Sequence, residues 1–237
     1  MKDHLLLWDV GGVLLKLSFS RFYQALSELT PFDRDRVKEM YDSSGLEMQM
    51  LAGAVEKEEY LDRLRDILHV LPGTTDEQLL AAYDCRYIER NSGIQRIRQI
   101  IQSAGYPSGI LSNIGSLTVE ELKRRYSGFF AVTGPCLLSY EEKSIKPELK
   151  MFRKAQQWCD ENGISSVTFV EDKAAYAAVG IDNFGWNGVL YTACIDKAES
   201  IRAAHLESAY PKKNFRIANS DEELLEALRS FGFVFSL

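Results

Sequence analysis

The sequence has 237 residues, 46% hydrophobic and 26% charged, a composition typical of a globular protein with one large domain or a core and a smaller second domain. Its formal net charge is −6 and it has no dense run of Lys and Arg, so we expect no binding to nucleic acid or to an anionic membrane surface. No apolar run approaches the length of a membrane span, which indicates a cytoplasmic protein. Four scattered cysteines without a CxxC pair favour free thiols over zinc ligands or disulfides: Cys85, Cys136, Cys159 and Cys194.

The N-terminal third combines one buried strand with a long helical stretch. The apolar residues 5–8, followed by the polar and glycine-containing residues 9–12, predict a buried strand that ends in a turn. Helical periodicity then dominates residues 17–90, with no convincing strand. Thr30 and Pro31 are expected to be the N-cap and first residue of one helix, and residues 56–68 form an amphipathic helix.

From residue 91 onward, predicted strands alternate with predicted helices. Strands are expected at 109–113, 129–132, 167–170 and 188–191. Helices are expected at 94–103, 117–125, 147–162, 174–179 and 220–230. This alternation predicts an α/β fold, a Rossmann-like parallel sheet with helices on both faces. We therefore expect a core domain made by residues 1–16 and 91–237 and an inserted all-helical cap domain made by residues 17–90.

Polar side chains of related chemistry follow the predicted strands or flank the helices between them: Asp9, Ser112, Asn113, Lys146, Glu171 and Asp172. In open parallel sheets, ligands bind beyond the carboxyl ends of the strands. Carboxylates suit a hard cation such as Mg²⁺ that bridges to phosphate, and a lysine and a serine hydroxyl bind phosphoryl oxygens. The sequence therefore predicts a combined phosphate and magnesium site.

Four segments, in this order, resemble the motifs of the haloacid dehalogenase-like (HAD) superfamily: LLLWDVGGVLL, GILSNIG, SIKPELKMF and VTFVEDKAAYAAVGIDNFGWNGV. The resemblance extends over essentially the whole chain, and the helical stretch after the first motif lies where the family has its helical cap. The first motif, Asp-x-Gly-Gly, is similar to a glucose-1-phosphatase-like branch of the family. Each motif is weak alone, but four in order are specific.

The resemblance implies a role for each of these residues. Asp9 would attack phosphorus and form an aspartyl-phosphate, and Lys146 would offset negative charge. Phosphate contacts would come from Gly11, Gly12, Ser112, Asn113 and Lys146. Magnesium would be held by Asp9, the backbone carbonyl of Gly11, Asp172 directly and Glu171 through a water.

The sequence departs from the family pattern at Gly11. Most phosphatases of the superfamily carry there a second Asp that protonates the leaving group and then activates water. Glycine cannot transfer a proton, and general acid–base help is commonly worth about a hundred- to ten-thousand-fold in rate. A good leaving group, such as an anomeric sugar phosphate or an acyl phosphate, needs little protonation, and Glu47 of the cap is a candidate substitute.

Two other functions remain open. One is a non-phosphatase hydrolase of the dehalogenase or phosphonatase type. The intact pair Glu171–Asp172 argues against a dehalogenase, and a phosphonatase would need a cap lysine such as Lys38 or Lys57. The other is a catalytically weak or inactive binding or regulatory module. We expect a magnesium-dependent hydrolase of a small phosphorylated metabolite, active as a monomer or homodimer.

Overall fold

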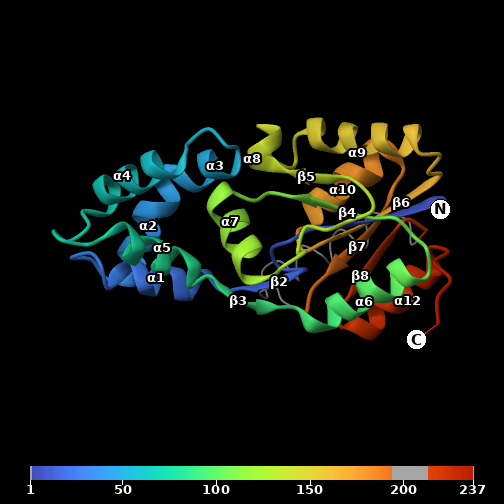
Figure 1. Ribbon diagram of the computed structural model, residues 1–237, viewed down its shortest axis with the longest axis horizontal. Coiled ribbons are helices and arrows are strands. Elements are labelled where there is room, and N and C mark those ends of the chain that lie inside the picture. The colour runs from blue at the N-terminus through green and yellow to red at the C-terminus, as the bar shows by residue number, and fades with distance from the viewer. Residues whose placement is uncertain (1, 194–212, 237) are drawn as a thin grey trace.

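The computed structural model describes residues 2–193 and 213–236, and within them six strands form one parallel sheet in the order β5-β4-β1-β6-β7-β8 (Figure 1). The strands are β1 His4–Trp8, β4 Ser108–Ser112, β5 Cys136–Leu138, β6 Ser166–Glu171, β7 Asn187–Tyr191 and β8 Phe215–Ala218. The first strand in the chain thus lies inside the sheet, between β4 and β6. This arrangement confirms the predicted α/β, Rossmann-like fold.

Helices cover both faces of the sheet, which is why β1 is apolar from Leu5 to Trp8 and entirely buried. Leu6 and Trp8 pack in the same apolar cluster as α6 and α12, whereas Leu5 and Leu7 pack with α9 on the other face. Figure 1 shows α6 and α12 below the sheet and α9 and α10 above it. The helices of this part of the chain are α6 Ser92–Ser103, α7 Ser116–Arg125, α8 Ser139–Glu142, α9 Leu149–Glu161, α10 Ala174–Phe184 and α12 Asp221–Ser230.

The remaining helices form a group beside the sheet, which we call the helical insert (Figure 1). It comprises α1 Phe19–Ser27, α2 Arg34–Ser44, α3 Leu46–Leu51, α4 Lys57–Leu68 and α5 Asp76–Asp84. These helices bury a cluster of their own, rich in aromatic side chains such as Phe22, Tyr41 and Tyr60. Leu117 of α7 belongs to the same cluster and so joins the insert to the rest of the molecule.

The expectation of no strand between residues 17 and 90 is wrong. Strand β2, Leu15–Leu17, pairs antiparallel with β3, Tyr87–Arg90, where the chain enters and leaves the helical insert. In Figure 1 this pair lies between the insert and the main sheet. Strands of three and four residues are too short to show the alternation by which a strand is recognised in sequence.

Several predicted boundaries also differ from the structure. The helix expected to begin at Pro31 begins at Arg34, because the Asp33 side chain accepts a hydrogen bond from the Arg36 amide and caps the helix there. The strand expected at 129–132 is a turn region, and the strand that pairs with β4 lies further on, at Cys136–Leu138. Phe129 is apolar because it packs in the core, 2% exposed, and not because it belongs to a strand.

The described cysteines Cys85, Cys136 and Cys159 are free thiols, and Cys194 lies outside the described residues. No helix among the described residues combines the length and apolar character needed to cross a membrane.

Candidate active site

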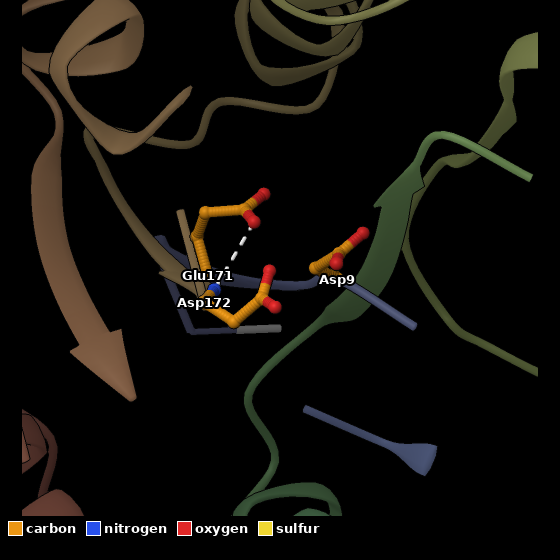
Figure 2. Close-up of side chains that lie close together, drawn as sticks. All are labelled: Asp9, Glu171 and Asp172. Atoms are coloured by element: carbon orange, nitrogen blue, oxygen red, sulfur yellow. Dashed lines mark hydrogen bonds between the residues drawn. The ribbon is translucent and has the colours of Figure 1, made fainter. Parts of the chain in front are cut away.

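The acidic residues predicted to form a site do lie together. Asp9 directly follows β1, and Glu171 ends β6 with Asp172 next in the chain. Because β1 and β6 are parallel neighbours, their carboxyl ends meet at one edge of the sheet. Each of the three carboxylates offers an oxygen within 4.8 Å of the other two, and Figure 2 shows the three side chains close together at the ends of their strands.

Lys146 is buried beside Asp9 and Glu171 of this acidic cluster. Its Nζ donates hydrogen bonds to Asp9 Oδ1 at 2.8 Å, to Glu171 Oε2 at 2.5 Å and to the Leu111 carbonyl at 3.0 Å. The side chain is only 1% exposed. Burial by itself lowers the pKa of Lys146, but Asp9 and Glu171 more than offset this, so the net shift is upward. The lysine is therefore a fixed positive charge among the carboxylates.

Asn113 holds Lys146 in place through the backbone. Its Oδ1 accepts a hydrogen bond from the Lys146 amide at 2.7 Å, and its Nδ2 donates to the Lys146 carbonyl at 3.0 Å. These two hydrogen bonds join the end of β4 to the lysine. The second N–H of Nδ2 and the second lone pair of Oδ1 are not used in this contact, and Asn113 lines the cavity described below.

Glu171 and Asp172 have different surroundings. Glu171 Oε1 accepts the backbone amides of Asp172 and Lys173, both at 3.0 Å, and its other oxygen accepts from Lys146. Burial, and next the charge of Asp9, raise the pKa of both Glu171 and Asp172. Carboxylates this close and this buried repel one another, and a divalent cation relieves such repulsion. The three carboxylates therefore fit a hard metal ion. Asp172 is the more available ligand, because its carboxylate accepts fewer hydrogen bonds than that of Glu171.

Glycine is required at position 12. Its φ is +78°, in the left-handed region, and a Cβ there would lie 2.2 Å from Asp172 Oδ2. The Gly12 amide donates to the Leu15 carbonyl at 2.9 Å, so it serves the turn after β1. Gly11, the preceding residue, lines the cavity described next.

A cavity of about 160 Å³ lies between the strand ends and the helical insert. Its lining includes all of the predicted site residues except Gly12: Asp9, Gly11, Ser112, Asn113, Lys146, Glu171 and Asp172. Ser112 Oγ is buried and has no hydrogen-bond partner among the described residues. A buried hydroxyl without a partner is rare, so this atom fits an oxygen acceptor supplied by a ligand.

The helical insert and its connection to the core supply the other wall, through Phe19, Glu47, Met48, Leu51, Arg86 and Tyr87. Glu47 Oε1 accepts from Arg86 Nη1 at 2.7 Å, and Glu47 Oε2 accepts from the Tyr41 hydroxyl. Both oxygens of Glu47 are thus engaged by other side chains, which argues against Glu47 as the substitute acid. Sequence reasoning missed Arg86, because one arginine between aromatic residues carries no motif.

Solved structures with the same fold are HAD enzymes. A HAD family enzyme from Bacteroides thetaiotaomicron, in complex with magnesium and inorganic phosphate, matches with a TM-score of 0.67 and 20% identity, over 85% of this chain and 100% of that chain. A HAD-like family hydrolase from Porphyromonas gingivalis matches with a TM-score of 0.64 and 19% identity, over 88% and 98%. L-2-haloacid dehalogenase from Xanthobacter autotrophicus matches with a TM-score of 0.59 and 14% identity, over 97% and 99%. No protein-family model and no curated protein matches the sequence.

Proposed function

Because the chain has the fold of HAD enzymes and gathers three carboxylates around a buried lysine, we propose that it is a magnesium-dependent hydrolase of small phosphate esters, acting through an aspartyl-phosphate on Asp9. The observation that carries the proposal is the environment of Asp9. Lys146 holds Oδ1, whereas Oδ2 has no hydrogen-bond partner among the described residues. A carboxylate fixed at one oxygen and open at the other is oriented for attack.

The chemistry follows from this arrangement. Asp9 Oδ2 forms a bond to phosphorus as the ester P–O bond breaks, and the leaving oxygen takes the electron pair and a proton from water. A second water then attacks phosphorus, which regenerates Asp9 and releases inorganic phosphate. Ser112 Oγ donates to a phosphoryl oxygen, and Lys146 offsets the negative charge that gathers around Asp9.

Asp9, the Gly11 carbonyl and Asp172 would hold Mg²⁺ directly, with Glu171 acting through a water. Bound there, the ion neutralises phosphoryl charge as a Lewis acid. The oxygens of Glu171 already accept three hydrogen bonds from the protein, which supports its indirect role. The B. thetaiotaomicron enzyme was solved with magnesium and inorganic phosphate, which supports these two groups as what the site of this chain binds.

Gly11 limits the substrates that this site can cleave well. Position 11 has no carboxylate, and Glu47 is ion-paired with Arg86, so neither residue supplies a general acid. The leaving group must then be good without prior protonation, as in an anomeric sugar phosphate or an acyl phosphate. The helical insert, as a cap domain of residues 17–90 over a core of 1–16 and 91–237, would select this small phosphorylated metabolite and exclude water.

One alternative is a non-phosphatase hydrolase, since a dehalogenase is among the structures with this fold. The intact Glu171–Asp172 pair favours the phosphatase. Lys38 and Lys57, the cap lysines considered for a phosphonatase, do not line the cavity, and Lys38 pairs with Asp42 on the surface of α2. The other alternative is a binding module that does not turn over, and the observation that favours it is Gly11.

The test is hydrolysis of a panel of small phosphates with and without Mg²⁺, by wild type and by Asp9→Asn. We expect magnesium-dependent phosphate release by wild type, reduced about a thousandfold or more in the variant. Trapping with fluoroberyllate should give density bonded to Asp9. Equal rates for wild type and Asp9→Asn on every ester would refute the enzymatic function. Turnover of a haloacid but of no phosphate would instead establish the dehalogenase.

A further inference from the structure

Arg86 is an unusual residue in the cavity wall. It lies between α5 and β3, and its side chain is 3% exposed. Its guanidinium carbon lies 3.6 Å from the centre of the Tyr83 ring and 4.2 Å from that of Phe22. Nη1 donates to Glu47 Oε1 at 2.7 Å and Nε to the Tyr83 carbonyl at 3.2 Å. The arginine is thus packed, ion-paired and fixed in one orientation.

One nitrogen of this fixed group remains unused. Arg86 Nη2 is buried and has no hydrogen-bond partner among the described residues. Buried donors are nearly always paired in native proteins, so a partner is expected from outside the chain. Ser112 Oγ is in the same condition, and both residues line the same cavity. The cavity therefore has one unsatisfied group from the core, at the proposed phosphate end, and another at the wall next to the helical insert.

We propose that Arg86 and Glu47 form a subsite for the leaving group, which recognises a neutral group bearing hydroxyls. This rests on the proposed phosphatase function, because it assigns the phosphoryl group to the Ser112 side of the cavity. Arg86 Nη2 donates to a hydroxyl oxygen of the leaving group. Glu47, which lines the cavity too, accepts a hydrogen bond from that hydroxyl or from a neighbouring one.

The charges favour a hydroxyl over a second anion. The positive charge of Arg86 is already balanced by Glu47 at 2.7 Å. An additional carboxylate or phosphate would be repelled by the Glu47 carboxylate, which lines the same cavity. A hydroxyl both accepts and donates, so it suits an arginine and a carboxylate presented side by side. Each Glu47 oxygen accepts one hydrogen bond in the structure and has a second lone pair available.

The rest of the wall suits the carbon skeleton of such a group. Phe19, Met48 and Leu51 line the cavity near the pair, and Phe19 and Met48 are 43% and 46% exposed. Apolar side chains contact the C–H faces of a polyol or sugar ring, while the polar pair fixes its orientation. Ligand sites commonly combine an apolar lining with a few placed polar groups in this way.

The experiment compares three substrates and four proteins. The substrates are glucose 1-phosphate, 4-nitrophenyl phosphate, which has no hydroxyl on its leaving group, and 3-phosphoglycerate, whose leaving group is anionic. The proteins are wild type, Arg86→Gln, Glu47→Gln and the control Arg63→Gln, a cap arginine that bonds Gln49 outside the cavity. Circular dichroism and thermal melting verify that each variant is folded, and Glu47→Gln, at a less buried position, is the milder change.

We expect Arg86→Gln and Glu47→Gln to lower kcat/KM for glucose 1-phosphate by about 10- to 100-fold, the effect of losing a hydrogen bond to a charged group. The value for 4-nitrophenyl phosphate should change less than about threefold, and Arg63→Gln should match wild type on all three substrates. Equal losses on the sugar and aryl phosphates would overturn the subsite, as would a loss confined to 3-phosphoglycerate.

The phosphatase function and the subsite can fail separately. Hydrolysis of esters that is unaffected by both variants would leave the function standing and remove the subsite. If the wild type hydrolyses none of the substrates, the subsite is tested instead by calorimetry, which measures the dissociation constant of glucose 1-phosphate in the presence of Mg²⁺. A dissociation constant raised about tenfold or more by Arg86→Gln and Glu47→Gln would support the subsite. An unchanged constant, or no binding by wild type, would overturn it.

Discussion

Replacing Lys146 by Met tests whether the lysine holds the acidic cluster together. Its Nζ bonds Asp9 and Glu171, at 2.8 and 2.5 Å, and the Glu171 side chain is fully buried. Methionine has a similar length and fills the space, so the change removes charge and hydrogen bonds more than volume. What remains is Asp9 and the fully buried Glu171 without the cation that hydrogen-bonds both.

Breaking a buried ion pair by removing one partner costs about 3–5 kcal/mol, because the remaining charge is buried without compensation. Globular proteins have a total free energy of unfolding of about 5–15 kcal/mol. Lys146→Met should therefore lower stability severely and still leave a folded population. Because Lys146 contacts two carboxylates, we expect the upper part of that range.

The assay is urea denaturation without added metal, followed by circular dichroism. The matched control is Lys154→Met, which removes an ion pair with Glu142 where the lysine side chain is 48% exposed. An exposed pair contributes about 0–1 kcal/mol, so the two variants should differ by at least about 2 kcal/mol. A loss below about 1 kcal/mol for Lys146→Met, or equal losses for both variants, would refute the reasoning.

Three further predictions concern metal, backbone and pH. Mg²⁺ at a hundred times its dissociation constant should raise the free energy of unfolding by about 2.7 kcal/mol in thermal melts. Asp172→Asn should remove this effect, whereas Asp160→Asn, at an exposed position of α9, should retain it. Gly12→Ala should destabilise the protein more than Gly73→Ala in urea titrations; both have positive φ, but only at Gly12 does a Cβ meet Asp172. Burial lowers the pKa of His4 from 6.5 to about 4, so the unfolded chain binds this proton more readily and stability falls as the pH drops from about 6.5 toward 4. His4→Gln should remove about 3 kcal/mol of that pH dependence, and identical pH dependence in both proteins would contradict it.

The fold and the acidic part of the site could be predicted because the causes are local. The apolar run of β1 is buried on both faces, and Asp9 follows it directly. Both the strand and the place of Asp9 at its end can therefore be recognised in the sequence. Glu171 ends β6 in the same way. Parallel pairing then brings the two ends together without any further information.

The other parts of the site depend on contacts between distant residues. Asn113 binds the backbone of Lys146, 33 residues away, a contact that the sequence prediction of Asn113 at the phosphate site did not include. Arg86 pairs with Glu47, 39 residues away, and neither stands in a motif. Strands β2 and β3 escaped prediction because their pairing, not their pattern, makes them strands. When a residue's hydrogen-bond partner lies far away in the sequence, the residue can be noticed in the sequence but its role cannot be predicted from it.

Gly11 offers a last test, because the chemistry it lacks can be added. A Cβ at Gly11 would lie 2.8 Å from Leu17 Cδ1, the end of a flexible side chain, so Gly11→Asp combined with Leu17→Ala has room. The new carboxyl should act as general acid and raise kcat for an alkyl phosphate by about a hundredfold or more over Leu17→Ala alone. For 4-nitrophenyl phosphate, whose leaving group needs no proton, the gain should stay below about threefold. A gain of the same size on both substrates would mean that the added carboxyl does not act by protonating the leaving group.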